Sequence, residues 1–276
     1  MIRELSAAVN EGSLHRALEV IERVVAERHD RPSLVSRIAC EIGAEIVEGI
    51  LCPGADLNSV DLAKRYATSR TPIREALMLL EKEGLVTIPP RRRPRVADLP
   101  IEDIREIYRV RAALFAAVAI EVVEKATPSD FVLLREFLAK MSRAHTEGDV
   151  TGFLWANVDF YNVFTTIARN RTAKRMIDSL LLRTLRFRRL SLSQPHRMDK
   201  SMANHNQLLD ACEERDAGLA AALIRSNHLH ALTALEACFG GKRTTRDQAE
   251  RTDEAAAQAP SRKRATASAK ARAVST

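Results

Sequence analysis

The stretch TSRTPIREALMLLEKEGLV, residues 68–86, begins with polar residues and a proline and then becomes periodic. Pro72 is compatible with the first turn of a helix, where the backbone amides have no partner within the helix. Gly84 is a typical residue at which a helix stops. Four apolar residues share one face of this helix and are expected to meet a core: Ile73, Ala76, Leu77 and Leu80.

The opposite face of the same helix carries cations at its start. Arg70, Thr71 and Arg74 point away from the predicted core. A helix dipole disfavours cations at the N-terminus unless an anion lies in front of them. The major groove of DNA offers such anions, with phosphates at its rim and guanine acceptors on its floor. Taken alone, this helix is equally compatible with a solvated start whose arginines serve solubility.

The flanking sequence adds the other parts of a DNA-binding domain. Ser33 is a plausible N-cap for a first helix, and Asn58 for a second, short one. After the third helix, LVTIPPRRRPRVADL predicts two short strands, 85–88 and 95–97, around a basic turn. Three helices followed by a hairpin form the winged helix-turn-helix pattern, so we place this domain at residues 31–98.

The segment LNSVDLAKRYATSRTPIREALMLLEKEGLV, residues 57–86, resembles the DNA-binding domain of the GntR family of bacterial transcription regulators. The resemblance extends over residues 34–98 and implies operator contacts from the third helix, supported by the start of the second. The predicted DNA contacts are Asn58, Ser59, Lys64, Ser69, Arg70, Thr71, Pro72, Arg74, Arg92 and Arg93. Two positions depart from the family pattern: Val60 replaces a base-reading arginine of some members, and Arg93 replaces the usual wing glycine.

From Pro100 onward the pattern is purely helical. Short breaks such as Thr127-Pro128 and Glu147-Gly148 separate the segments, which is typical of an antiparallel bundle with short loops. The predicted helices are 101–126, 128–147, 149–169, 171–192, 196–214 and 216–239. The fold class is therefore mainly α, with a β-hairpin wing and a C-terminal antiparallel helical bundle.

The C-terminal half is similar to the FCD-type ligand-binding domain of the FadR subgroup. The residues that carry the similarity include DIREIYRVRAALFAAVA at 103–119, FYNVFTTIARN at 160–170 and LRFRRLSLSQPHR at 185–197. We place this domain at residues 99–240. The resemblance implies a homodimer, an effector pocket inside the bundle, and effectors that are small carboxylates.

Many members of that subgroup hold a divalent metal with one Asp and three His, a ligand set that suits Zn, Ni or Mn. The matching positions here are Asn157, Tyr161, His205 and Asn227. His228 is adjacent, but one residue along a helix turns a side chain by about 100°. We therefore predict a pocket without metal or cofactor.

In that pocket we expect an organic acid to be the effector. Asn and Tyr bind cations poorly and hydrogen-bond organic ligands well. The predicted effector contacts are Arg111, Asn157, Tyr161, His205 and Asn227, with Arg111 pairing with a carboxylate. For each residue the alternative is a buried polar side chain that is satisfied by its neighbours.

The chain as a whole has 276 residues and a net charge of +7, which suits a polyanionic partner. No apolar run is long enough for a membrane span, and the four cysteines have no paired spacing, so we expect a cytoplasmic protein. Residues 1–30 predict an N-terminal helical extension. Residues 241–276 contain one large aliphatic residue and predict a disordered basic tail.

The predicted function is sequence-specific transcriptional regulation. We expect a homodimeric repressor that binds double-stranded DNA at a two-fold symmetric operator and is released by a small carboxylate metabolite. Metalloprotease, phosphate-loop and nucleophile-elbow motifs are all missing from the sequence, so no catalytic residue is assigned. The alternatives are an architectural DNA-binding protein without an effector, and a metal-dependent enzyme centred on His205 and His228.

Overall fold

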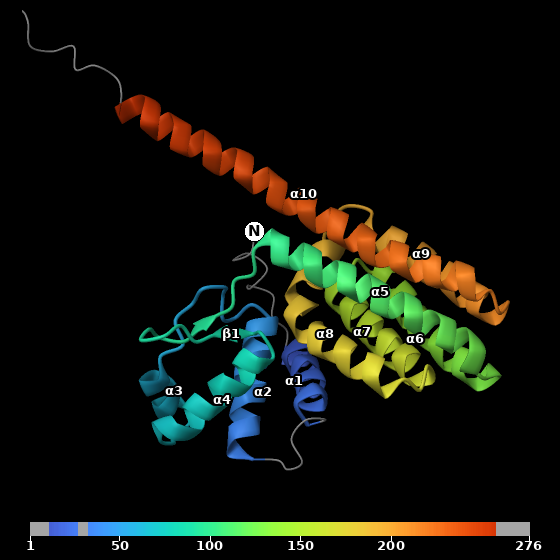
Figure 1. Cartoon of the computed structure of the whole chain (residues 1–276), viewed down its shortest axis with the longest axis horizontal. Helices are drawn as coiled ribbons and strands as arrows, with labels where there is room; N and C mark the ends of the chain where they lie inside the picture. The colour runs from blue at the N-terminus through green and yellow to red at the C-terminus, as the bar shows by residue number, and fades with distance from the viewer. Residues whose placement is uncertain (1–10, 27–32, 258–276) are drawn as a thin grey trace, which may run out of the picture. The chain divides into compact units, whose positions relative to one another are not determined.

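Helices dominate the computed structural model, which describes residues 11–26 and 33–257 (Figure 1). The described residues up to Leu235 form one compact unit, and the rest of the last helix, from Glu236, is a separate unit. Within the described residues, β structure is limited to one two-stranded sheet and an isolated bridge. No described helix is long and apolar enough to cross a membrane.

The first helix of the DNA-binding domain, α2 (Leu34–Val47), begins where the sequence predicts. Ser33 is its N-cap, and a capping box joins Ser33 and Ser36 through reciprocal side-chain to backbone hydrogen bonds. Ile38, Ile42 and Ile46 are buried, so this face of α2 forms part of the core.

Helices α3 (Ser59–Arg65) and α4 (Arg70–Lys82) follow, and Asn58 caps α3 as predicted. The predicted apolar face of α4 is confirmed, because each of its four residues is 0% exposed: Ile73, Ala76, Leu77 and Leu80. Gly84 follows α4 with φ +72°, a left-handed conformation that glycine adopts without strain. A Cβ at Gly84 would also displace the flexible guanidinium end of Arg183.

The wing is a short antiparallel hairpin of β1 (Val86–Thr87) and β2 (Arg95–Val96), with Val86 opposite Val96. Both strands are shorter than predicted. Three prolines stand in or beside the intervening loop, at positions 89, 90 and 94. Proline has no N–H to donate, so these residues cannot extend the ladder.

The C-terminal part of the compact unit is a helical bundle in which α6 packs on α7 and α9, and α5 packs on α7, α8 and α9. Asparagine, aspartate or threonine side chains cap α6, α7 and α8, which explains why their starts were predictable. Apart from the end of α10, every predicted boundary lies within two residues of the observed one. The bundle helices are α5 (Ile101–Lys125), α6 (Pro128–Thr146), α7 (Val150–Ile167), α8 (Arg171–Leu192), α9 (Arg197–Glu213) and α10 (Ala217–Ala257).

Helix α10 continues through residues 241–257 to Ala257, beyond its predicted end at residue 239. This stretch contains four Ala and three Arg, which have high intrinsic helix propensity, and no proline occurs in it. The glycines at 240 and 241 therefore do not end the helix. Residues 258–276 lie outside the described part of the chain.

The predicted N-terminal extension contains helix α1 (Glu11–Ala26), while residues 1–10 and 27–30 lie outside the described part. Ala17, Val20, Ile21 and Val24 are buried in the same core cluster as α2. Gly43 of α2 allows the close approach of α1, since a Cβ there would lie 3.2 Å from Ile21 Cδ1. Helix α1 is therefore an integral part of the compact unit.

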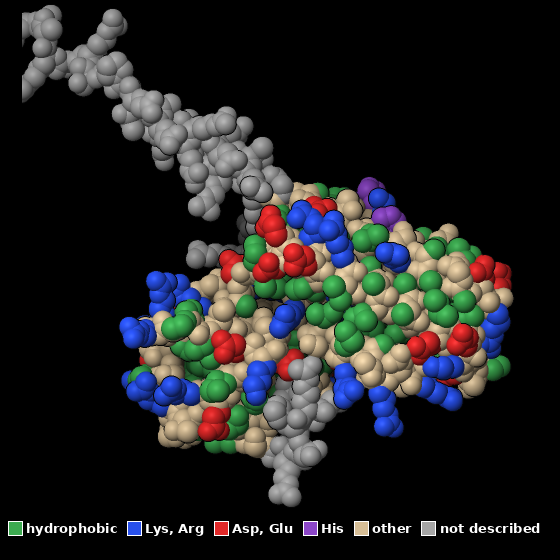
Figure 2. Space-filling view, in the orientation of Figure 1, with side chains coloured by type: hydrophobic (Ala, Val, Ile, Leu, Met, Phe, Trp, Pro, Cys, Tyr) green, Lys and Arg blue, Asp and Glu red, His purple; other side chains and the backbone are tan. Residues whose placement is uncertain are grey.

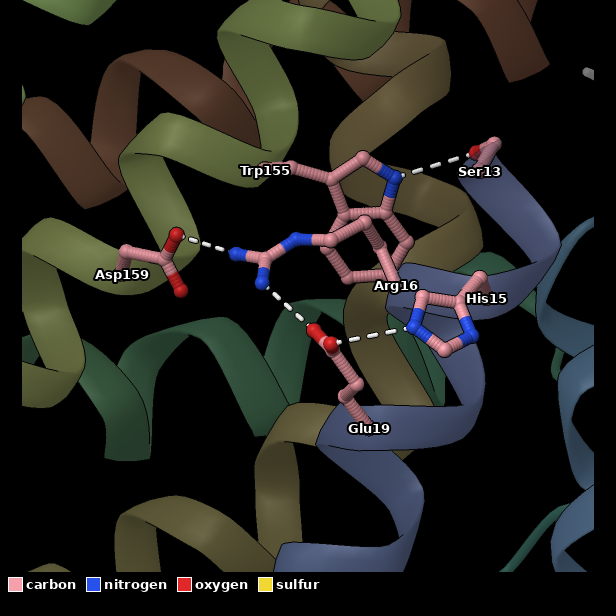
Figure 3. Close-up of polar contacts among 6 residues, drawn as sticks. All are labelled: Ser13, His15, Arg16, Glu19, Trp155 and Asp159. Atoms are coloured by element: carbon pink, nitrogen blue, oxygen red, sulfur yellow. Dashed lines mark hydrogen bonds and ion pairs between the residues drawn. The ribbon is translucent and has the colours of Figure 1, made fainter. Parts of the chain in front are cut away.

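Polar contacts also join α1 to helix α7 of the bundle (Figure 3). Trp155 Nε1 donates a hydrogen bond to Ser13 Oγ at 3.0 Å, and Arg16 forms ion pairs with Asp159 and Glu19. The Ser13 hydroxyl in turn donates to the buried carboxylate of Glu48 at 2.8 Å. Helix α1 thus contacts both α2 of the DNA-binding domain and α7 of the bundle.

Candidate DNA-binding surface and buried arginine cavity

The start of α4 presents polar groups that have no partner among the described residues. Ser69 is the N-cap by position, but its hydroxyl makes no capping hydrogen bond. Ser69, Arg70, Thr71 and Arg74 are all exposed. Within the described part of the chain, neither Arg70 nor Arg74 pairs with an acidic side chain. The four residues form one exposed surface of hydroxyls and guanidinium groups at a helix N-terminus, where anions are favoured.

The other predicted DNA contacts on α3 and α4 differ in exposure and in their hydrogen bonds within the protein. Lys64 is exposed, whereas Ser59 and Pro72 are half-buried. Asn58 is engaged locally: its Oδ1 accepts from the amide of Val60 at 3.0 Å, and its Nδ2 donates to Asp61 at 2.7 Å. Asn58 therefore holds the start of α3 in place.

The loop between the two strands carries exposed arginines, including the predicted Arg92 and Arg93. Arg95, by contrast, pairs with Asp56 at 2.7 Å and belongs to the local structure of the wing. Figure 2 shows Lys and Arg side chains gathered at the end of the domain where α3 and the hairpin lie. This cationic end suits a phosphate backbone.

Inside the bundle, helices α5, α7, α8, α9 and α10 enclose a cavity of about 40 Å³. Four of the five predicted effector residues line it, namely Arg111, Asn157, Tyr161 and Asn227. Each of the four is at most 6% exposed. Asn227 Nδ2 donates to the Tyr161 hydroxyl at 3.0 Å, which fixes the orientation of both side chains.

The fifth predicted residue, His205, lies behind the cavity wall and is 0% exposed. Its Nδ1 must carry a hydrogen, because it lies 2.6 Å from the Ser201 carbonyl oxygen, which can only accept. Its Nε2 then accepts from Asn157 Nδ2 at 2.9 Å, and Asn157 Oδ1 accepts from Arg188. Burial lowers the pKa of His205 to about 4, so the ring is neutral at pH 7. His205 orients Asn157.

Three buried guanidinium groups line the cavity, those of Arg111, Arg188 and Arg197. Burial lowers the pKa of all three, and that of Arg111 falls to about 10 through burial and the charge of Arg188. Among the described residues that line the cavity, none is an Asp or a Glu. A buried cation without a partner is costly, so the arrangement favours a bound anion.

Comparisons with known proteins match two regions of the chain. Residues 34–96 match the family model for bacterial regulatory proteins of the gntR family, and residues 106–231 match the FCD domain. The chain is 30% identical over 192 residues to an uncharacterized HTH-type transcriptional regulator in an unstable DNA locus of Streptomyces ambofaciens, covering 66% of this chain and 76% of that protein. This chain belongs to the GntR family. Its FCD domain agrees with the predicted FadR-type architecture.

Two further relatives extend the comparison. The GntR regulator is 28% identical over 210 residues to the gluconate operon transcriptional repressor of Bacillus licheniformis, covering 72% of this chain and 82% of that repressor. The structure of E. coli McbR/YncC covers 76% of the chain and 100% of McbR/YncC, with a TM-score of 0.65 and 24% identity. The structural match shows the fold, and the family and relatives make this a DNA-binding transcriptional regulator. The prediction that it is not an enzyme is confirmed.

Sequence analysis missed Arg188 and Arg197 as cavity residues of the GntR regulator. Arg188 follows Leu181 and Leu185 and precedes Leu192 at helical spacing, so it occupies a position on an apolar stripe. Arg197 precedes His205 by eight residues on the buried face of α9. An arginine on the buried face of an amphipathic helix was the available signal.

The neighbouring arginines of α8 also have partners within the protein. Arg183 Nε donates to the carbonyl oxygen of Glu83 at 3.3 Å, and Arg186 Nη1 donates to that of Ala97 at 2.9 Å. Arg189 forms an ion pair with the buried Glu48 at 2.8 Å. These three arginines bind α8 to the DNA-binding domain of the GntR regulator.

The residues at the family's metal positions do not fit a divalent cation. His205 uses both ring nitrogens within the protein, and His228, which lines the cavity, has its Nδ1 2.9 Å from the Ile224 carbonyl oxygen. Across the side chains that the structure describes, no three His, Cys, Asp or Glu residues converge. The adjacent guanidinium groups would also repel a cation. A metal-free pocket in this GntR regulator stays a prediction.

Proposed function

We propose that this GntR regulator is a repressor that is released from its operator when a small organic acid binds in the buried cavity. The observation that carries the proposal is Arg111, which is 2% exposed and leaves Nε and Nη1 without a hydrogen-bond partner at a cavity wall. A carboxylate is the complementary group for such a guanidinium. Asn157, Tyr161 and Asn227 would orient the rest of the acid, with His205 holding Asn157.

For the DNA contacts we propose two roles. Ser69, Arg70, Thr71 and Arg74 reach base edges and the adjacent phosphates from the start of α4. The remaining residues position the domain on the DNA backbone or in the minor groove. They are Asn58, Ser59, Lys64, Pro72, Arg92 and Arg93.

Helix α8 supports a physical link between the two sites. Arg188 lines the cavity, and on the same helix Arg183 and Arg186 donate to carbonyl oxygens just after α4 and β2. A displacement of α8 by a ligand at Arg188 would therefore act on the two elements that we expect to touch DNA. Such a coupling needs the ligand to favour one of two arrangements of this helix.

The test is release of operator DNA in a mobility-shift assay with the intergenic DNA upstream of the gene. We expect the operator to be released by a carboxylate metabolite in the wild type and in Arg109→Met, which alters an exposed arginine on the same helix as Arg111. Arg111→Met should bind the operator and no longer respond. If no small acid releases the wild type, the effector role is wrong and an architectural role becomes the better account.

A further inference from the structure

We propose that the cavity binds a compact anion with at least two negative charges, such as a phosphate group or a dicarboxylate, in preference to a single carboxylate. The inference rests on the proposed effector site and adds the charge class of its ligand. The cavity residues that carry it are Tyr108, Arg111, Arg188 and Arg197.

The first observation is the number of unpartnered donors at the cavity wall. Arg111 and Arg197 each leave Nε and Nη1 without a partner, and the Tyr108 hydroxyl is also unpartnered. Nε carries one hydrogen and Nη1 two, so about seven donor hydrogens are available. A carboxylate has two oxygens with about four acceptor sites, which is too few. A phosphate group, or two carboxylates, can accept most of these hydrogens.

The second observation is the charge balance. Arg111, Arg188 and Arg197 are at most 8% exposed, and no described Asp or Glu lines their cavity. Asp178 lines a smaller neighbouring cavity with Arg111 and Arg188, and it is already paired with Lys174 at 2.6 Å. A monoanion would leave two of the three cavity guanidinium groups without a counter-charge. A dianion leaves one.

Arg188 and Arg197 also donate hydrogen bonds within the protein, and these bonds fix the orientation of their guanidinium groups. Arg188 donates to Asn157 Oδ1, and Arg197 Nη2 donates to the side-chain and backbone oxygens of Asn227, at 3.0 and 3.1 Å. These bonds hold both guanidinium planes in place before a ligand enters. Binding an anion then costs little side-chain ordering.

Water and long ligands fit this cavity less well. A volume of about 40 Å³ can hold water, but water also needs acceptors for its own hydrogens, and among the unpartnered atoms of the lining only the Tyr108 hydroxyl can accept. The volume limits how much of a ligand can enter, so a compact anionic group fits better than a long chain. The ligand, or the part of it inside the cavity, is therefore small and acceptor-rich.

The experiment is calorimetric titration of the metal-free full chain with inorganic phosphate, malonate and acetate at constant ionic strength and pH 7.5. We expect phosphate or malonate to bind at least about tenfold more tightly than acetate, since each additional charge-assisted hydrogen bond contributes a factor of that order. The phosphate and malonate arms distinguish a phosphorylated ligand from a dicarboxylate.

Arg111→Met is the informative variant, because Arg111 makes no hydrogen bond to any described residue and only stacks on Phe115. It should lose at least about tenfold in dianion affinity, and its melting temperature without anion should be unchanged or higher. Arg109→Met, exposed on the same helix, should bind like the wild type. Arg111→Lys keeps the charge but loses the planar donor pair, so its dianion affinity should lie between those of Arg111→Met and the wild type. It provides a second test if Arg111→Met does not fold.

The outcomes separate this inference from the proposed function. Equal affinity for acetate and the dianions, no binding of either dianion, or dianion binding that Arg111→Met leaves unchanged would each overturn the inference. Operator release by a monocarboxylate in those cases would leave the proposed function standing. Dianion binding without any operator release would support the charge class and overturn the proposed release mechanism.

Discussion

Arg70 and Arg74 extend into solvent from the first turns of α4 and have no partner in the described part of the chain. We expect Arg70→Ala and Arg74→Ala each to weaken operator binding by about 1–3 kcal/mol per half-site, the range for a lost bidentate base contact. The melting temperature should not change, because neither side chain contributes to the core. Fluorescence anisotropy with operator DNA and thermal unfolding measure the two effects.

Lys82→Ala is the matched control, because Lys82 is exposed at the opposite end of the same helix. It should reduce operator affinity far less than either arginine variant. Normal operator binding by Arg74→Ala would show that α4 meets DNA through a different face.

His205 should make the stability of the protein depend on pH. Burial lowers its folded pKa from 6.5 to about 4. The unfolded histidine therefore takes up a proton below pH 6.5, whereas the folded one does so only below about 4. Stability should fall as the pH drops through this window, by roughly 3 kcal/mol in full. Urea unfolding between pH 4 and 7 measures this loss of unfolding free energy.

The variant for this test is His205→Gln, which offers an amide oxygen to Asn157 but does not titrate. Its stability should fall less between pH 6.5 and 4 than that of the wild type. Some dependence should remain, because burial also lowers the pKa of His228. An unchanged pH dependence in His205→Gln would show that His205 has the same pKa in the folded and unfolded states.

Helix α1 lies outside the matched family regions, yet it contributes buried residues to the core that it shares with α2. Ile21 is 0% exposed, so Ile21→Ala should destabilise the protein by about 2–5 kcal/mol through the cavity that it leaves. His15→Ala, on the exposed face of α1, should change the unfolding free energy by less than about 0.5 kcal/mol. Denaturant unfolding compares the two. If Ile21→Ala changed the unfolding free energy as little as His15→Ala, α1 would be detached from the core in solution.

The complete regulator should be a homodimer that reads a two-fold symmetric operator. One recognition helix contacts only a few base pairs, and useful specificity requires two half-sites. Light scattering at micromolar concentration should give twice the chain mass, and footprinting should show two related half-sites. A monomer, or a single asymmetric half-site, would contradict this arrangement.

Much of the fold was predictable because it depends on short-range interactions. Caps such as Ser33, Asn58 and Thr127 mark helix starts through bonds to amides two or three residues away. The buried face of α4 follows from helical periodicity alone. The same periodicity placed Arg70 and Arg74 on the outside. The predicted end of α10 at residue 239 was too early, because residues with high helix propensity follow the glycines at 240 and 241.

The chemistry of the cavity depended on how the helices pack. Arg111, Asn157, Tyr161 and Asn227 come from three helices, and only their packing shows that one cavity collects them while His205 lies behind its wall. The buried arginines are a second case. Helical spacing puts Arg188 on the apolar stripe of α8, but only the packing shows that it lines the cavity, whereas Arg183, Arg186 and Arg189 contact the DNA-binding domain. A side chain's solvent exposure and its partners depend on residues distant in sequence, and these long-range contacts determine its charge state and its role.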